Sequence, residues 1–217
     1  CIRDSFRTNP QALEKLTGWV NARDAARQPA AMYAMGSLLL AKDDLAGAVK
    51  MAEDGLSKYP QSLPVQTLSL NTITTLLDKN RVEDAERLIS KYPGTSPGLV
   101  FQQGGLAFRK GDYPLAQSLF REAARRASEK TAESALFNEN LAALNANDAA
   151  GAAALVKEAA GSAQLREHIL FEQAHYAAKR MNPQAPELLA SFVALATDPA
   201  LKTQARLDQA EVALNLN

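Results

Sequence analysis

Two histidines and a glutamate lie close together in the sequence and are the first candidates for chemistry. His168, Glu172 and His175 fall at positions i, i+4 and i+7, so one face of a helix could offer three ligands to a metal ion. They do not have the HExxH spacing of zinc proteases, and no fourth ligand is evident. We therefore expect these residues to face solvent or cap a helix, and we expect no metal and no cofactor.

The sequence does not nominate the parts of an enzyme active site. Asp43-Asp44 lies at a predicted turn and Glu53-Asp54 on a polar helix face, so we expect both acidic pairs to be solvated surface residues. Catalysis would need a nucleophile beside a base in a pocket, and neither role has a candidate. We expect the protein not to be an enzyme.

The only cysteine, Cys1, is the first residue of the sequence. With one cysteine no internal disulfide is possible, so cysteine usage leaves the redox compartment open. One interpretation is that Cys1 is the first residue of a mature bacterial lipoprotein, whose thiol carries the lipid. The other is a boundary inside a longer chain, just after a membrane-spanning segment.

Composition and charge favour packed helices and give no electrostatic reason to bind nucleic acid. Hydrophobic residues make up 47% of the 217 residues and aromatic residues only 6%, a balance rich in Ala and Leu. Twenty-four basic residues match twenty-four acidic ones. No apolar run approaches the ~20 residues that span a bilayer. We therefore expect a membrane link only through an anchor at or before Cys1.

The stretch from Pro97 to Ala127 predicts two antiparallel helices joined by a tight turn at Lys110-Gly111-Asp112. Small residues let the two backbones approach closely, and large apolar residues fill the remaining space. They are Gly104, Gly111, Ala116 and Ala123, with Tyr113 and Phe120 between them. Because such a hairpin cannot bury its apolar face alone, it implies neighbours of the same kind.

This spacing of glycine, alanine and aromatic residues resembles a tetratricopeptide repeat (TPR). Three more segments follow the same landmarks, although Ile73 in one and Asn140 in another replace the first glycine. The equivalent residues Ala48, Ala85, Ala116 and Ala152 lie 37, 31 and 36 residues apart. The resemblance implies an all-α fold, an α-α superhelix (a TPR-like solenoid) of antiparallel helix pairs with N- and C-terminal capping helices. We expect a single domain over 1–217, with an N-terminal segment and cap at 1–28, four repeats at 29–163, and a degenerate repeat and C-terminal cap at 164–217.

The same landmarks predict the positions of the remaining helices. They are Pro10–Asp24, Pro29–Ala41, Leu45–Lys58, Leu63–Leu77, Val82–Lys91, two helices within about 133–163, Arg166–Met181, Pro186–Ala196 and Pro199–Leu214. The last helix carries Leu207, Ala210 and Leu214 on one face, and we interpret it as the C-terminal cap.

In a stack of helix pairs the first helix of each pair lines the inner surface, where its outward residues can contact a ligand. The register of the small residues places eight residues there: Tyr33, Asn71, Phe101, Gln102, Arg109, Phe137, Asn138 and Asn145. A primary amide can donate to a peptide C=O and accept from a peptide N–H, so we predict a groove that binds a peptide or helix, anchored by Tyr33, Phe101 and Phe137. The alternative is that the aromatics pack against the neighbouring repeat and the amides face water.

Some TPR proteins bind acidic chaperone tails through lysines and asparagines at set inner positions. Here Tyr33, Ser37 and Gly98 stand at such positions, so the resemblance does not extend to that role.

We therefore expect a noncatalytic protein-protein interaction scaffold with a protein or peptide partner and no nucleic acid. Its most concrete form is a bacterial envelope assembly or export factor on the periplasmic side of a membrane, lipid-anchored or tethered, with a cytoplasmic location as the alternative. A second interpretation is a TPR regulatory or substrate-recruiting domain of a larger membrane enzyme such as a glycosyltransferase. A third is self-association, with the capping helices stacking end to end.

Overall fold

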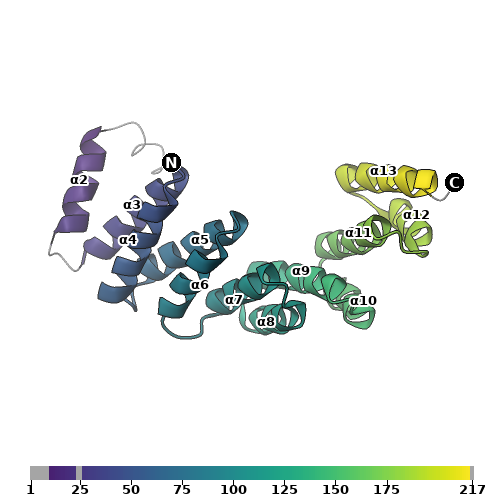
Figure 1. The fold of residues 1–217 in the computed structure, drawn as a ribbon, viewed down its shortest axis with the longest axis horizontal. Helices are drawn as coiled ribbons and strands as arrows, with labels where there is room; N and C mark the ends of the chain where they lie inside the picture. The colour runs from purple at the N-terminus through teal and green to yellow at the C-terminus, as the bar shows by residue number, and fades with distance from the viewer. Residues whose placement is uncertain (1–9, 23–25, 216–217) are drawn as a thin grey trace. The chain divides into compact units, whose positions relative to one another are not determined.

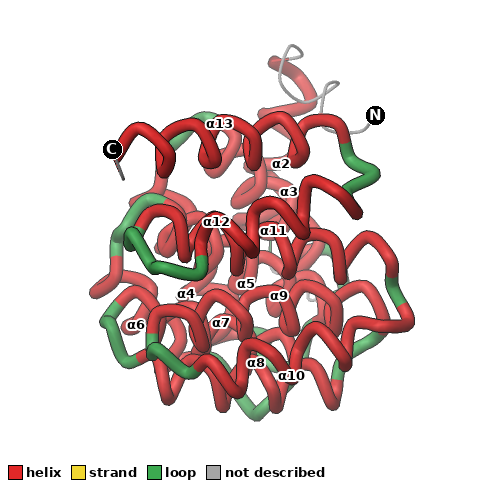
Figure 2. The backbone as a smooth tube through the Cα atoms, turned by 90° about the vertical axis from the view of Figure 1, so that its right-hand side faces the viewer, coloured by secondary structure: helices red, strands yellow, loops and turns green. Residues whose placement is uncertain are grey.

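The computed structural model describes residues 10–22 and 26–215. Within these ranges every secondary structure element is a helix, with twelve α-helices and one short 3-10 helix joined by short loops (Figure 2). Two predictions fall outside the described residues: the role of Cys1 and the end of the first helix at Asp24.

The chain forms two compact units, residues 1–111 and 112–217. The first contains α2 (Pro10–Asn21), α3 (Gln28–Ala41), α4 (Leu45–Lys58), α5 (Leu63–Asp78), α6 (Val82–Lys91) and α7 (Pro97–Arg109) (Figure 1). Each helix packs against the next, and α3, α4 and α5 also pack against the helix two places further on. α3 and α5 approach so closely that a Cβ atom at Gly36 would overlap the side chain of Leu68.

The second unit contains α8 (Tyr113–Arg126), α9 (Glu129–Asn145), α10 (Ala149–Glu158), the 3-10 helix η1 (Ala159–Gly161), α11 (Ala163–Lys179), α12 (Ala185–Leu195) and α13 (Pro199–Asn215). Here α9 packs against α8, α10 and α11, and α11 packs against α10, α12 and α13. Both units are therefore built from helices in antiparallel pairs that contact mainly their neighbours along the chain, which is consistent with a helical repeat. The largest shifts from the expected bounds are at the start of α9, at Glu129 instead of about residue 133, and at the start of α11, at Ala163 instead of Arg166.

The turn inside each helix pair has the same backbone geometry. A residue with left-handed backbone geometry ends the first helix at Asp43, Asn80, Gly111, Asn147 and Met181, which lie 37, 31, 36 and 34 residues apart. In three of these turns the next residue is an N-cap aspartate that accepts a backbone N–H: Asp44 from Gly47, Asp112 from Leu115, and Asp148 from Gly151.

The four landmark alanines each follow one of these left-handed residues by five positions, and all are buried, with at most 4% of their surface exposed. The alanines therefore occupy equivalent positions in the structure, as the register required. Their burial explains why no larger residue stands there.

The last helix packs on the core with a face other than the one that carries Leu207, Ala210 and Leu214. α13 buries Ala205, Asp208 and Val212, whereas Leu207 and Leu214 are 59% and 80% exposed. The reason is that Asp208, which a sequence pattern would assign to solvent, is hydrogen-bonded inside the unit.

Candidate functional site

A groove of about 440 Å³ lies between α9 and α11 in the second unit. Its walls are Lys130, Glu133, Ser134, Phe137 and Asn138 from α9, and Gln164, Leu165 and His168 from α11. The α9 residues follow the spacing i, i+3, i+4, i+7 and i+8, so one helix face forms the whole of that wall. The structure thus brings together Phe137 and Asn138, two of the predicted groove residues.

The apolar centre of the groove is Phe137, whose ring meets His168 edge to face with the ring centroids 6.4 Å apart. Phe137 is half-buried and also packs against the core residues around Leu155 and Ile169. The helix interior therefore fixes the orientation of the ring while part of it stays accessible in the groove.

The polar groups of the groove have spare hydrogen-bonding capacity. The side-chain amide of Asn138 donates to the backbone carbonyl of Ser134 at 2.9 Å, and its amide oxygen has no partner among the described residues. Lys130 and Glu133 at the same wall have no ion-pair partner in the described part of the chain. The groove can accept from a peptide N–H and can contact charge of either sign.

A half-buried amide, that of Gln173, links the helices that form the two walls. Gln173 on α11 donates from Nε2 to the Asn140 side-chain oxygen at 2.9 Å and to the Ala152 carbonyl at 2.8 Å. This single side chain joins α9, α10 and α11, and Asn140 has no exposed surface. The sequence had assigned Asn140 to a position that glycine occupies in the landmark repeat, so its polar role was not foreseen.

A buried ion pair supports α9 from the opposite side. The Arg121 Nε on α8 lies 2.6 Å from Oε1 of Glu139, whose side chain is fully buried. Burial raises the pKa of Glu139, and the Arg121 guanidinium opposes that rise. Without Arg121, ionised Glu139 would carry an unpaired charge in the interior.

Five predicted groove residues belong to the first unit, on α3, α5 and α7. Gln102 is buried, with only 8% of its surface exposed, and donates from Nε2 to the Thr74 hydroxyl at 2.8 Å. It links α7 to α5, and this bond uses one of its two amide hydrogens. Tyr33 is half-buried and packs against the core of the first unit.

The remaining predicted residues are more accessible. Asn71 and Phe101 are half-buried and Arg109 is exposed at the end of α7. In the second unit Asn145 ends α9 and donates to the Leu141 carbonyl at 2.8 Å. None of these four residues lines the groove at Phe137. Among the described cavities, this groove is the one that predicted residues line.

The residues first considered as metal ligands have structural partners. His175 Nδ1 lies 2.6 Å from the buried carboxylate of Asp208, and its ring stacks on Phe171. Burial raises the pKa of Glu172, an effect that the neighbouring histidines oppose. Among the described residues no three His, Cys, Asp or Glu side chains are grouped so as to hold a metal ion. Only His168 reaches the groove, through its contact with Phe137.

The sequence contains one further catalytic motif that was not among the predicted candidates. Residues 94–98, Gly-Thr-Ser-Pro-Gly, match the GxSxG pattern of serine hydrolases. In the structure Ser96 is the N-cap of α7, and its hydroxyl oxygen accepts from the Leu99 N–H at 3.2 Å. The segment follows a helix, whereas the hydrolase motif needs a strand that ends in a strained turn. The motif therefore begins a helix here.

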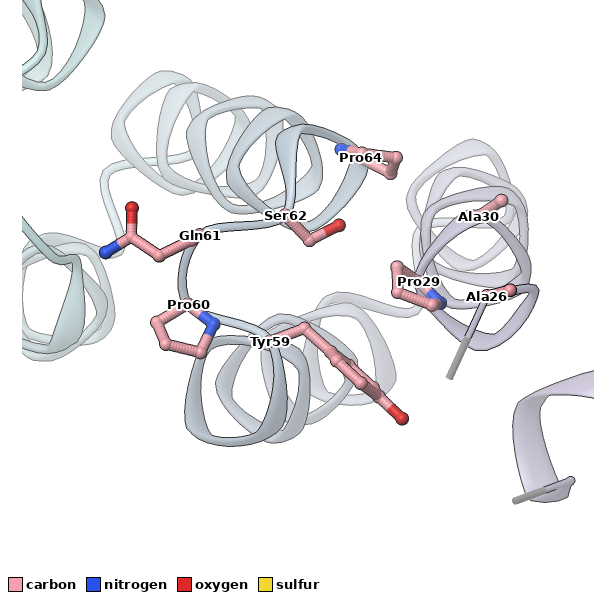
Figure 3. Close-up of a pocket in the computed structure, with 8 residues that line it drawn as sticks. All are labelled: Ala26, Pro29, Ala30, Tyr59, Pro60, Gln61, Ser62 and Pro64. Carbon is pink, nitrogen blue, oxygen red and sulfur yellow. The ribbon is translucent and has the colours of Figure 1, made fainter. Parts of the chain in front are cut away.

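A second cavity, of about 490 Å³, lies in the first unit between the start of α3 and the loop that joins α4 to α5 (Figure 3). Its lining consists of Ala26, Pro29, Ala30, Tyr59, Pro60, Gln61, Ser62 and Pro64. The Tyr59 hydroxyl donates to the Gln28 side-chain oxygen. Three prolines without N–H groups and a tyrosine already bonded leave few polar groups to bind a ligand, so we favour the α9 and α11 groove as the site.

No family model matches this sequence, and the curated proteins contain no match to it either. Throughout the described part of the chain, every helix falls short of the length and apolarity that crossing a membrane requires.

Proposed function

We propose that this protein is a noncatalytic, TPR-like helical-repeat scaffold that binds a peptide or helix of a partner protein. The observation that carries the proposal is the groove between α9 and α11, with the half-buried Phe137 at its centre and the unpaired amide oxygen of Asn138 at its wall. An apolar anchor beside backbone-compatible amides suits a peptide of mixed composition. The rigid support from Gln173 and Arg121 lowers the ordering cost of binding.

Selection of peptides from a random library against the 217-residue chain tests the proposal. The best synthetic peptide is then titrated by fluorescence anisotropy against wild type, Phe137→Ala, Asn138→Ala and His168→Ala. We expect each substitution to weaken binding about tenfold, because truncating a side chain that is desolvated near the centre of an interface commonly costs more than ~1 kcal/mol. Leu115→Ala, at an exposed leucine of α8 outside the groove, is the matched control and should bind like wild type.

Circular dichroism separates a lost contact from a lost fold. Asn138→Ala should keep the helicity and melting temperature of wild type, because the amide bonds only to its own helix at an exposed position. If selected peptides bind Asn138→Ala and Leu115→Ala equally well, or if no peptide binds, the proposed groove is wrong.

We also propose that the scaffold works on the periplasmic side of a bacterial membrane, anchored through Cys1, as an envelope assembly or export factor. The proposal rests on the single cysteine of the sequence, whose thiol can carry a lipid. Mass spectrometry of the protein isolated from its native membranes should find a lipid on Cys1, and Cys1→Ser should release the protein. An unmodified Cys1 in native material would contradict this localisation.

A further inference from the structure

Exposed apolar side chains are concentrated at the C-terminal end of the second unit. Eight large apolar residues are exposed among the described residues, and five of them lie in the loop before α12, on α12 and on α13: Met181, Leu188, Leu195, Leu207 and Leu214. A concentration of this kind on a soluble protein marks a surface that another molecule covers. Terminal repeats of helical-repeat proteins ordinarily present a polar outer face.

Two of these residues, Leu207 and Leu214, belong to one stripe along α13. The stripe consists of Ala200, Thr203, Leu207, Ala210 and Leu214, all exposed, at alternating spacings of three and four residues. The opposite face of α13 packs against α11 and α12 through Ala205, Asp208 and Val212. We call these five exposed residues the outer stripe. Its spacing is that of the a and d positions of paired helices, and it contains no charged residue.

The outer stripe is complementary to itself when two copies of α13 run antiparallel. With a two-fold axis midway between Leu207 and Ala210, Leu207 of each copy faces Ala210 of the other, and Leu214 faces Thr203. Every leucine then meets a small residue, so the two surfaces interlock without leaving gaps. An unrelated partner helix would need this pattern by coincidence.

The residues beside the stripe fit the same pairing. Gln204 and Glu211 flank one edge, and in antiparallel helices like edges face each other, which places Gln204 of one copy within a turn of Glu211 of the other. On the other edge Arg206 lies level with Ala213 of the second copy, so no two like charges are opposed.

We propose that the outer stripe of α13 is an isologous dimer interface between two copies of this chain, paired antiparallel about an axis between Leu207 and Ala210. One pair of helices buries less than the ~800 Å² per partner of a standard interface, so the dimer is weak and forms only at high protein concentration. The proposal does not depend on the peptide groove, which is lined by α9 and by the first residues of α11.

Sedimentation equilibrium of the 217-residue Cys1→Ser chain over a wide concentration range tests the association. We expect a monomer and dimer equilibrium in which Leu207→Glu weakens dimerisation at least ~10-fold, because two carboxylates would be buried at the seam. The control is Leu63→Glu, at a leucine of α5 that is 74% exposed, and it should dimerise like wild type. A chain that stays monomeric at millimolar concentration, or equal effects of the two substitutions, would overturn the proposal.

Cysteine pairing tests the register. In the Cys1→Ser background, a chain with Leu207→Cys is mixed with a differently tagged chain with Ala210→Cys and oxidised. The antiparallel pairing predicts that the mixed disulfide between the two variants exceeds either homodimeric disulfide. A parallel pairing would favour the homodimers, and head-to-tail stacking would give assemblies larger than dimers; either result contradicts the proposed interface.

Discussion

Buried and half-buried polar side chains link neighbouring helices in both units. Gln102 joins α7 to α5, Gln173 joins α11 to α9 and α10, and Glu139 joins α9 to α8 through Arg121. A buried hydrogen bond adds only about 1 kcal/mol net, but an unsatisfied partner costs more, so these residues fix geometry more than they add stability. Among them only Gln102 was predicted to line the groove, so its groove and packing roles must be told apart by experiment.

Gln102→Ala should lower the free energy of unfolding by about 1–2 kcal/mol, because it removes a buried hydrogen bond and leaves a gap between α5 and α7. Asn71→Ala, at a half-buried amide whose side chain has no described partner, should change it by less than ~0.5 kcal/mol. Urea denaturation of both variants measures the difference. Equal losses would place the two amides in the same structural role.

Arg121→Ala should cost about 3 kcal/mol at pH 7, because it leaves the fully buried Glu139 carboxylate without its counter-charge. Lys179→Ala on α11, which loses an exposed pair with Glu211, is the control and should cost ~0.5 kcal/mol or less. Urea denaturation at pH 7 measures both.

The Arg121→Ala loss should depend on pH in a direction that Glu139 determines. Burial raises the pKa of Glu139 in the folded protein, so the folded state binds a proton at this carboxyl more readily than the unfolded state does. The resulting contribution to stability is therefore present at low pH and lost as pH rises. Removing Arg121 strengthens that effect. The difference from wild type should therefore shrink from pH 7 to pH 4, and a difference that grows on acidification would mean that Glu139 is not the buried acid responsible.

At the scale of elements, most helix boundaries follow from local chemistry that the sequence displays. The predicted α4 and α6 match the observed bounds at both ends, because a turn with Asp or Asn precedes them and Tyr-Pro follows them. The start of α9 was missed by four residues because the register of the repeat was used in place of the local signal at Ser128, the actual N-cap. The burial of Asp208 does not follow from the sequence of α13 alone, because its partner His175 lies on α11.

The candidate site was predictable in part for the same reason. Phe137 and Asn138 follow from the register of one helix, whereas Gln164 and His168 line the groove only because α11 packs beside α9. Gln102 had the right register for a groove residue and was nevertheless buried, since Thr74 on the neighbouring helix supplied an acceptor. The spacing of residues in the sequence predicts which side of a helix they lie on. It does not predict the hydrogen-bond partners that the neighbouring helix provides.

The left-handed residues in the turns between paired helices predict the effect of two substitutions on stability. Met181 has φ 51°, a left-handed conformation that costs a residue with a Cβ about 1 kcal/mol, so Met181→Gly should raise stability by up to ~1 kcal/mol. Gly111, at φ 78°, is the reverse case, and Gly111→Ala should lower stability by about the same amount. Thermal unfolding followed by circular dichroism compares them. A destabilising Met181→Gly would show that the methionine side chain contributes more than the turn.

At the scale of the whole molecule, helices that contact mainly their chain neighbours should open locally. Leu68→Ala removes a fully buried side chain that lies against Gly36 and should cost about 3 kcal/mol. Hydrogen exchange should then speed up in α3, α4 and α5, while α11, α12 and α13 exchange at wild-type rates. Uniform acceleration in both units would mean that the chain unfolds as one cooperative body.

The recurring turn has a consequence for how such a gene can change. A left-handed residue and a buried alanine five positions later recur at Asp43 with Ala48, Asn80 with Ala85 and Asn147 with Ala152. A DNA segment that runs from one turn to the next therefore encodes a helix pair whose two ends have the same backbone geometry. Unequal crossing-over between such turns would add or delete a whole helix pair and recreate an intact joint at the splice. The length of this protein can therefore evolve in steps of one pair without inventing a new turn.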